Sequence, residues 1–146
     1  MKVLIVYDSI YGNTERIAKA IGEAVTGEVR VARVGEITPA GLQPVDVLIV
    51  GSPTLGGRPT EPIQNFLAAV PSDAIKGIRV ASFDTRYSGK FVKLFGFAAE
   101  KIMQTLEAKG GRSVPPLGDF IVTGKKGPLK EGELERAASW AREIVK

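Results

Sequence analysis

The chain has 146 residues, no cysteine, no histidine and a formal net charge of +4 at pH 7. The length is typical of one domain with one hydrophobic core, and no stretch reaches the roughly 20 apolar residues that cross a bilayer. The missing cysteines exclude disulfides and thiol nucleophiles, and the missing histidines remove the side chain that titrates nearest neutral pH. Any redox or acid–base chemistry is therefore expected to come from a bound cofactor.

The basic residues are scattered rather than gathered in one patch. Over residues 130–146, KEGELERAASWAREIVK, they alternate with acidic residues, as is typical of a solvated helix face. This alternation disfavours nucleic acid as a partner. Charged Asp8 interrupts the first apolar run too early for a signal peptide, so a cytoplasmic protein is expected.

Apolar runs and amphipathic patterns alternate along the first half of the chain. Residues 3–7 form a continuous β-branched run, typical of a strand buried on both faces, and residues 17–25 have the spacing of an amphipathic helix. Residues 29–34 alternate more, as expected for a strand nearer the edge of a sheet. Turn-forming residues fill 35–46, which predicts a loop or a very short helix before a buried strand at residues 45–51.

The second half of the chain continues this alternation. It predicts a helix at 63–70, a strand at 78–83, a helix at 95–106, a strand at 120–123 and a helix at 134–145. Together these elements predict one α/β domain over residues 1–146, with a parallel sheet and helices on both faces. Ligands bind at the carboxyl ends of the strands in such sheets, so the loops after the first, third and fourth strands are candidate sites.

The first of these loops, DSIYGNT at residues 8–14, has the residues of an anion-binding loop. Ser9 and Thr14 supply hydroxyl groups, and Gly12 permits a positive φ that lets successive N–H groups converge. Asn13 or Thr14 begins a helix whose positive end favours an anion. The pattern predicts a phosphate cradle without a lysine, although a capped helix after a tight turn would use the same residues.

The second and third loops have features that suit a flat ligand. In GSPTLGGRPTEP, residues 51–62, the Gly56–Gly57 pair lets the backbone approach a ring or flip a peptide. In DTRYSGK, residues 84–90, Tyr87 could stack on such a ring, and a plain surface tyrosine is the alternative. The motifs GxxxxGK[ST] and GxGxxG are both missing, which disfavours nucleoside triphosphate hydrolysis and a dinucleotide site.

On these motifs the sequence resembles the flavodoxin family. Residues 9–14, SIYGNT, match the family's phosphate-loop pattern [ST]-x-T-G-x-T except that Tyr11 replaces the middle threonine. The stretches YDSIYGNTE, GSPTLGG and YSG are most similar to the flavodoxin-like domains of flavodiiron proteins and to quinone-reductase relatives. The resemblance covers essentially the whole chain. It implies a doubly wound, five-stranded parallel sheet of order 2-1-3-4-5 and a noncovalently bound FMN.

The resemblance also implies which residues hold each part of FMN. The loop at 9–14 would bind the phosphate, residues 52–57 and 84–89 would border the isoalloxazine ring, and Tyr87 would stack on it. No side chain is assigned as catalytic or as a metal ligand. The implied cofactor-binding residues are Ser9, Ile10, Tyr11, Gly12, Asn13, Thr14, Ser52, Pro53, Thr54, Leu55, Gly56, Gly57, Asp84, Thr85, Arg86, Tyr87, Ser88 and Gly89.

The function implied by the resemblance is electron transfer through FMN between a reductase and an acceptor protein, by a monomer or weak homo-oligomer. Arg58, Arg86 and Lys90 lie in the cofactor loops and predict a basic rim that favours acidic partners. One alternative is an FMN-dependent NAD(P)H:quinone or protoporphyrinogen-type oxidoreductase. Another is a flavin-free binding domain of the same fold, to which the departures at Tyr11 and Leu55 point.

Overall fold

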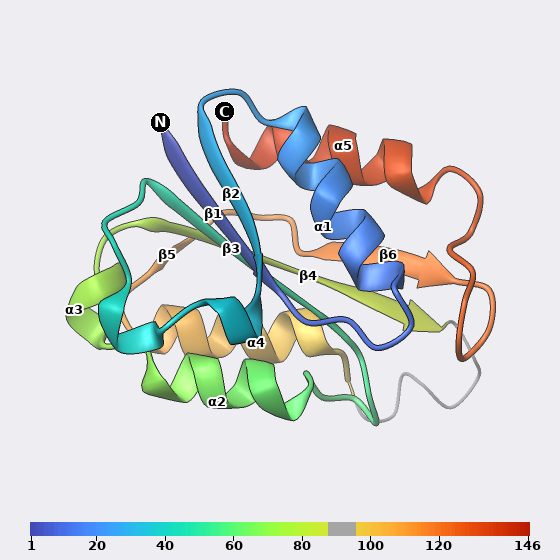
Figure 1. Ribbon diagram of the computed structural model, residues 1–146, viewed down its shortest axis with the longest axis horizontal. Helices are drawn as coiled ribbons and strands as arrows, with labels where there is room; N and C mark the ends of the chain where they lie inside the picture. The colour runs from blue at the N-terminus through green and yellow to red at the C-terminus, as the bar shows by residue number, and fades with distance from the viewer. Residues whose placement is uncertain (88–95) are drawn as a thin grey trace.

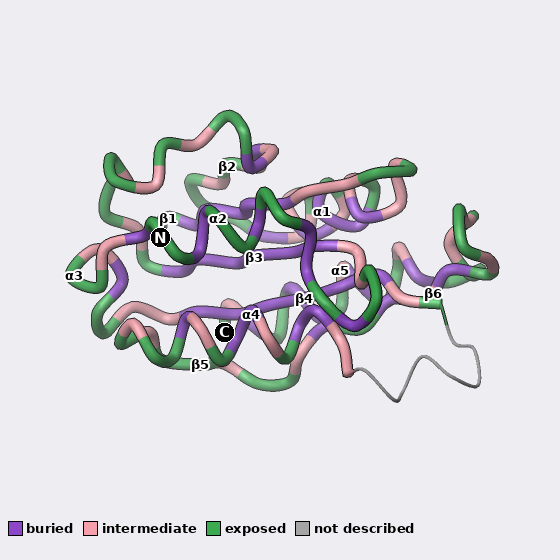
Figure 2. Tube along the Cα trace, turned by 90° about the horizontal axis from the view of Figure 1, so that it is seen from below, coloured by how far each residue is buried: buried purple, intermediate pink, exposed green. Residues whose placement is uncertain are grey.

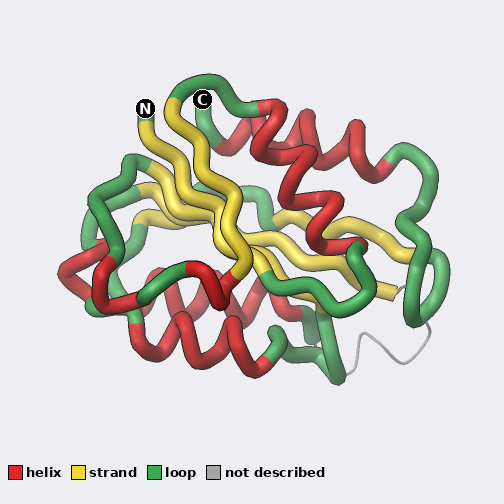
Figure 3. Tube along the Cα trace, viewed as in Figure 1, coloured by secondary structure: helices red, strands yellow, loops and turns green. Residues whose placement is uncertain are grey.

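A parallel sheet lies between two layers of helices in the computed structural model, which describes residues 1–87 and 96–146 (Figure 1). The strands are β1 Lys2–Tyr7, β2 Glu28–Arg33, β3 Val47–Pro53, β4 Arg79–Tyr87, β5 Arg112–Ser113 and β6 Gly118–Val122. The helices are α1 Asn13–Ala24, α2 Glu61–Ala69, α3 Ser72–Ile75, α4 Ala98–Ala108 and α5 Glu133–Ile144. Figure 3 shows α1 and α5 on one side of the strands and α2 and α4 on the other.

The strand order is β2-β1-β3-β4-β5, with every pairing parallel, and β6 also pairs with β4. This confirms the order 2-1-3-4-5, and β2 occupies the edge that its alternating pattern predicts. The fifth position of the sheet is divided between two strands. β5 pairs with the start of β4 at Arg79–Val80, and β6 pairs with the end of β4 at Phe83–Tyr87. The fold is therefore the expected one with a sixth, short strand added.

The expectation of one hydrophobic core is wrong, because side chains of β1 alternate between two cores, one on each face of the sheet. Val3, Ile5 and Tyr7 pack with α1 and α5, whereas Leu4 and Val6 pack with α2 and α4. Because both faces of the strand are covered, an apolar residue is needed at every one of these positions. Figure 2 shows the same burial along the central strands.

The core beside α1 and α5 contains a cluster of three aromatic rings. Trp140 of α5 lies edge-to-face against Phe83 and against Phe120, with 6.0 Å between ring centroids in each pair. Its indole N–H donates to the carbonyl of Pro116 at 2.8 Å. The side chain is thus held by packing and by one hydrogen bond, which satisfies its polar atom.

Two strands run further towards the carboxyl end of the sheet than the sequence predicts. β3 includes Ser52 and Pro53, and β4 continues through Asp84 to Tyr87, so these residues lie in strands and not in loops. The parallel ladder continues through the polar residues, with Ser52 opposite Asp84. The buried polar side chains at these positions are hydrogen-bonded, which removes the usual cost of burying them.

The helical segments differ from the sequence prediction in smaller ways. The stretch 35–46 is spanned by two 3₁₀ turns, Val34–Glu36 and Pro39–Gly41, and by loop, in agreement with the expected loop or very short helix. α4 begins at Ala98, and Phe95, at the start of the predicted helix, lies outside the described residues. The one-turn helix α3 was not predicted. In the described part of the chain, no helix combines the length and the apolar character that crossing a bilayer requires.

Candidate functional site

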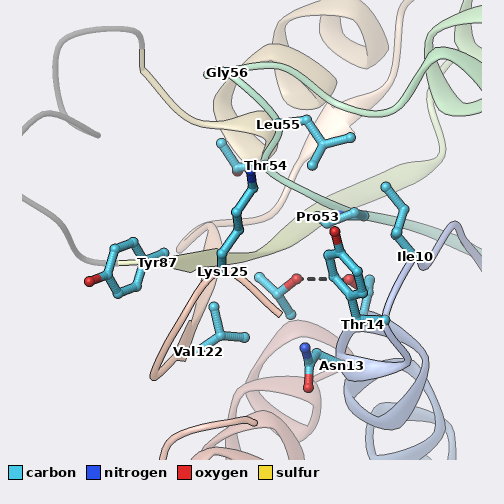
Figure 4. Close-up of a pocket in the computed structure, with 12 residues that line it drawn as sticks. Ile10, Asn13, Thr14, Pro53, Thr54, Leu55, Gly56, Tyr87, Val122 and Lys125 are labelled. Carbon is cyan, nitrogen blue, oxygen red and sulfur yellow. Dashed lines mark hydrogen bonds between the residues drawn. The ribbon is translucent and has the colours of Figure 1, made fainter. Parts of the chain in front are cut away.

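A cavity of about 330 Å³ opens where the strands end at their carboxyl termini (Figure 4). This volume is within the range of small-molecule sites, about 300–1,000 Å³. Except for Val122 and Lys125, its lining belongs to the set of residues that the sequence implies. The lining residues are Ile10, Tyr11, Asn13, Thr14, Pro53, Thr54, Leu55, Gly56, Thr85, Tyr87, Val122 and Lys125.

The loop between β1 and α1 is folded around the hydroxyl of Ser9. Its Oγ accepts hydrogen bonds from the N–H groups of Gly12 at 3.1 Å and Glu15 at 3.3 Å. Gly12 has φ +91°, a left-handed conformation that glycine adopts without strain. Ser9 and Gly12 therefore fix the conformation of the loop, and neither residue lines the cavity.

Four backbone N–H groups of this loop have no hydrogen-bond acceptor within residues 1–87 and 96–146. They belong to Ile10, Tyr11, Asn13 and Thr14. The last two lie in the first turn of α1, where N–H groups have no partner inside the helix and the helix dipole is positive. Such a group of donors is suited to an anion such as a phosphate.

Arg33 at the end of β2 holds this loop from the side of the sheet edge. Its guanidinium donates to the carbonyl of Ser9 at 3.0 Å and lies 3.4 Å from the carboxylate of Asp8. It also lies 3.7 Å from Glu15 and 5.3 Å above the ring of Tyr7. No sequence motif contains Arg33, although the parallel register that pairs Tyr7 with Arg33 could have indicated it.

A pair of buried hydroxyl groups joins the loop to the centre of the sheet. The Oγ1 atoms of Thr14 and Thr85 are 2.7 Å apart, and both residues line the cavity. This hydrogen bond connects the first turn of α1 to β4. The first helical turn is therefore held by the sheet as well as by Arg33.

The opposite wall of the cavity is a tight turn at residues 55–58. Leu55 and Arg58 exchange two backbone hydrogen bonds of 2.8 and 3.0 Å. Gly56 and Gly57 have φ +56° and +80°, and two positive values in succession are the signature of a type I′ turn. The carbonyl of Gly57 accepts from Lys101, whereas the carbonyl of Gly56 accepts no hydrogen bond from the described residues.

Exposed apolar side chains are concentrated at this cavity. In the described chain, five large hydrophobic residues are exposed, and all of them except Met1 line the cavity. These are Ile10, Tyr11, Leu55 and Tyr87, with 51%, 49%, 43% and 48% of their surfaces exposed. A gathering of this kind is typical of a ligand or interaction site. The cavity thus combines an anion-binding loop with an apolar rim.

Residues 5–140 match the family model described as Flavodoxin. The chain belongs to the flavodoxin family. Membership supports flavin binding and electron transfer. Among solved structures, an archaeal flavodoxin superposes with a TM-score of 0.83 at 21% identity and covers 99% of this chain and 96% of its own. Flavodoxin 1 of Bacillus cereus gives 0.80 at 20% identity and covers 99% and 97%. At these identities the structural likeness supports the fold.

The relatives of this chain include a diflavin flavoprotein and a quinone dehydrogenase. Diflavin flavoprotein A 4 of Synechocystis sp. is 36% identical in an alignment of 110 positions that covers 70% of this chain and 17% of that protein. A protein of Methylocella silvestris named NAD(P)H dehydrogenase (quinone) is 31% identical in an alignment of 124 positions that covers 64% of this chain and 62% of that protein. This flavodoxin therefore spans only about a sixth of the diflavin relative.

Two of the predicted cofactor-binding residues, Ser52 and Gly57, are buried and lie outside the lining of the cavity. Ser52 is fully buried, and its Oγ accepts from the N–H of Thr60 at 3.0 Å and donates to the carbonyl of Pro53 at 2.8 Å. Gly57 is buried as well, with its carbonyl turned towards Lys101. Neither residue lines the cavity, so both act on it only by holding the loop.

Asp84 and Arg86 form a buried ion pair behind the cavity. The carboxylate of Asp84 accepts two hydrogen bonds of 2.8 Å from the guanidinium and one of 2.9 Å from the N–H of Ala99. Burial raises the pKa of Asp84, and Arg86 opposes this rise. The guanidinium also lies 3.5 Å from the centroid of the Phe97 ring. The prediction that Arg86 belongs to an exposed basic rim is therefore wrong, because its charge is paired and covered.

The lining of the cavity also includes a lysine that is not among the residues implied by the sequence. Lys125 lies in the segment between β6 and α5 and lines the cavity with Val122. This segment lies outside the three loops, after the first, third and fourth strands, that the sequence indicates as candidate sites. The lysine pair that follows the predicted strand at residues 120–123 was the available signal. Ser88, Gly89 and Lys90 lie outside the described residues.

Proposed function

We propose that this flavodoxin binds FMN noncovalently and carries electrons between two redox partner proteins. The proposal rests on one observation. At the carboxyl ends of the strands, one cavity combines N–H groups that have no acceptor with four of the five exposed large apolar side chains of the described residues. This combination is suited to a ligand with a phosphate at one end and a flat apolar ring at the other.

Each group of residues would hold a different part of FMN. The N–H groups of Ile10, Tyr11, Asn13 and Thr14 would donate to the phosphate, and the hydroxyl of Thr14 is held near it by Thr85. Leu55 and Tyr87 would cover the ring and exclude water from it. When bound, the flavin supplies the capacity to accept one or two electrons, and the protein supplies its orientation and electrostatic surroundings.

A binding comparison tests this proposal. The chain is titrated with FMN and with riboflavin, which lacks the phosphate, and binding is followed by calorimetry and by the visible absorption of the flavin. FMN should bind at least tenfold more tightly, because hydrogen bonds to a charged acceptor contribute about 1.5–3 kcal/mol each. Equal affinities would argue against the cradle. Failure of both ligands to bind would instead leave the flavin-free alternative.

The charges near the cavity support acidic redox partners. Arg58, Lys125 and Lys126 are exposed beside the cavity or on its walls. Attraction between surfaces of opposite charge speeds the association of two proteins, and salt screens this attraction. Electron transfer to an acidic acceptor protein should therefore slow as salt is added, in stopped-flow measurements. Transfer to a basic acceptor should show the opposite trend.

A quinone oxidoreductase is the second candidate, supported by the relative named NAD(P)H dehydrogenase (quinone). An enzyme of this kind needs room for a small acceptor beside the flavin, and the exposed rim residues Leu55 and Tyr87 are suited to an apolar one. Steady-state NADPH oxidation with a quinone separates the two functions. A carrier should be slow unless a reductase is added, whereas an enzyme should turn over alone.

A further inference from the structure

We propose that Lys125 supplies a cationic contact at the ring end of the flavin site and that this contact favours the fully reduced, anionic ring. The proposal deepens the FMN site proposed above and depends on it. It adds a specificity-determining residue from a part of the chain that the motifs of the sequence do not include.

The segment from Val122 to Leu129 folds back on itself as a closed loop. Val122 and Leu129 form an antiparallel bridge, and both the N–H and the hydroxyl of Thr123 donate to the carbonyl of Pro128, at 2.8 and 3.1 Å. Within the loop, the N–H of Gly127 donates to the carbonyl of Gly124 at 3.0 Å. The loop therefore has a defined shape of its own.

This closed loop is docked on the phosphate-binding loop. The side-chain amide of Asn13 donates to the carbonyl of Lys126 at 3.2 Å. At Gly127, φ is +100°, and an added Cβ would lie only 2.6 Å from Nδ2 of Asn13. Such a close approach is possible only for glycine. The position of Lys125 is thus set from the first turn of α1.

The two neighbouring lysines have different positions relative to the cavity. Lys125 lines it, and Figure 4 shows the side chain reaching across towards Thr54, with its amine pointing away from Asn13. Lys126 does not line it, and its amine lies 6.0 Å from the ring centroid of Tyr11. No carboxylate of residues 1–87 or 96–146 lies within ion-pair distance of Lys125. Its charge is therefore uncompensated at the end of the cavity opposite the phosphate donors.

A cation at this position discriminates between two states of one ligand. The oxidised flavin ring is neutral, and the fully reduced ring carries a negative charge at neutral pH. Coulomb attraction acts on the reduced ring alone, and for a solvent-screened pair it corresponds to roughly a three- to fivefold gain in affinity. A contact with the phosphate would instead strengthen the binding of both forms equally.

The test measures the affinities of oxidised FMN and of dithionite-reduced FMN for the full chain, with Lys125→Gln, Lys125→Arg and the matched control Lys126→Gln. For Lys125→Gln we expect a roughly three- to fivefold loss of affinity for reduced FMN and less than a twofold loss for oxidised FMN. Lys125→Arg should restore the affinity for reduced FMN. Lys126→Gln should leave the ratio of the two affinities unchanged.

Two results would overturn the assignment of Lys125. An equal loss for both forms of FMN would place the contact at the phosphate, and identical behaviour of Lys125→Gln and Lys126→Gln would show a general effect of net charge. Both results require that the unchanged chain binds FMN. If it does not, the proposed function fails first, so the two failures are distinguishable.

Discussion

The two ends of the cavity are built in opposite ways. The loop at residues 9–14 is held by the hydroxyl of Ser9, by Arg33 from the edge strand and by the Thr14–Thr85 pair. The turn at residues 55–58 is held at its base by the Leu55–Arg58 pairing and at Gly57 by Lys101, while Gly56 is exposed and its carbonyl accepts no hydrogen bond from the described residues.

This difference separates two tasks that one cofactor site has to perform. Donors for an anion bind most tightly when they are already in position, because no ordering cost is then paid on binding. A wall that responds to the charge of its ligand needs a second conformation within a few kcal/mol of the first. We therefore expect substitutions at the held end to change affinity or stability, and substitutions in the turn to change redox potentials.

The largest effect is expected at Gly12. Gly12→Ala places a side chain at φ +91°, which costs about 1–2 kcal/mol, although the added Cβ would meet no atom within 4 Å. The strain would displace the N–H groups that follow, so the Kd for FMN should rise about tenfold, which corresponds to 1.4 kcal/mol. Calorimetric titration measures the change.

Gly35→Ala is the matched control for this prediction. An added Cβ at Gly35 also has no neighbour within 4 Å, but Gly35 does not have a positive φ. The affinity of Gly35→Ala for FMN should stay within about twofold of the affinity of the unchanged chain. If Gly12→Ala binds as tightly as Gly35→Ala does, the conformation of the loop is not what holds the phosphate.

A smaller effect is expected at Glu133, which connects the start of α5 to β6. Its carboxylate accepts from the N–H of Ile121 at 2.7 Å and from Arg136, and the Arg136 hydrogen bonds lower the pKa of Glu133 against the effect of burial. Because its pKa is lower in the folded than in the unfolded state, the ionised group stabilises the fold above the unfolded pKa. This contribution is lost as the pH falls through the folded pKa.

Glu133→Gln should therefore lower the free energy of unfolding by about 1 kcal/mol at pH 7, and the difference should shrink as the pH falls below the ordinary pKa of a glutamate, about 4.3. Urea denaturation followed by circular dichroism, at pH 7 and at a pH below this pKa, measures the free energy of unfolding of both chains. The control is Glu135→Gln, which removes an exposed carboxylate from the same first turn of α5. A loss that is the same at both pH values would show that the ionisation of Glu133 is not its source.

The smallest effect is expected in the turn. Rotation of the peptide between Gly56 and Gly57 would convert type I′ to type II′, in which Gly56 keeps a positive φ and Gly57 takes a negative one. Gly57→Ala should favour the rotated form and Gly56→Ala the unrotated form. If the Gly56 carbonyl turns towards the flavin on reduction, the two substitutions should shift the difference between the two one-electron potentials in opposite directions.

For each variant, the difference between the two one-electron potentials should shift by about 20 mV, which is equivalent to roughly 0.5 kcal/mol. Redox titration of the FMN-loaded protein measures it, and the urea midpoint of each variant serves as the control, because Gly57 is buried. If neither variant changes the difference between the potentials, the turn does not respond to reduction. FMN affinity should change little in both, in contrast to Gly12→Ala.

The architecture was predictable because its signal is local and repeated. Each central strand is covered on both faces, so runs such as residues 3–7 are apolar at every position. β5 has no such signal, since Arg112–Ser113 is polar and exposed and is recognised as a strand only by its pairing with β4. The extension of β4 through Asp84 was missed for a similar reason, because Arg86 and Ala99 satisfy a carboxylate that looks like a loop residue in the sequence.

The site was predictable only as far as its residues are neighbours in the sequence. The loops at residues 9–14 and 52–57 are short motifs, and most of their members line the cavity. Arg33 and Lys125 reach the site through strand register and through a docked loop, and no short motif contains them. Contacts of this kind depend on how distant segments pack together.

Trp140 gives this protein an optical signal that is separate from the absorption of a bound flavin. It is the only tryptophan of the chain, it is packed against Phe83 and Phe120, and it does not line the cavity. Its fluorescence should therefore report on the folding of the α1–α5 side of the molecule, and the visible absorption of a bound flavin on the site. Loss of cofactor and loss of structure can thus be followed as distinct events in one sample.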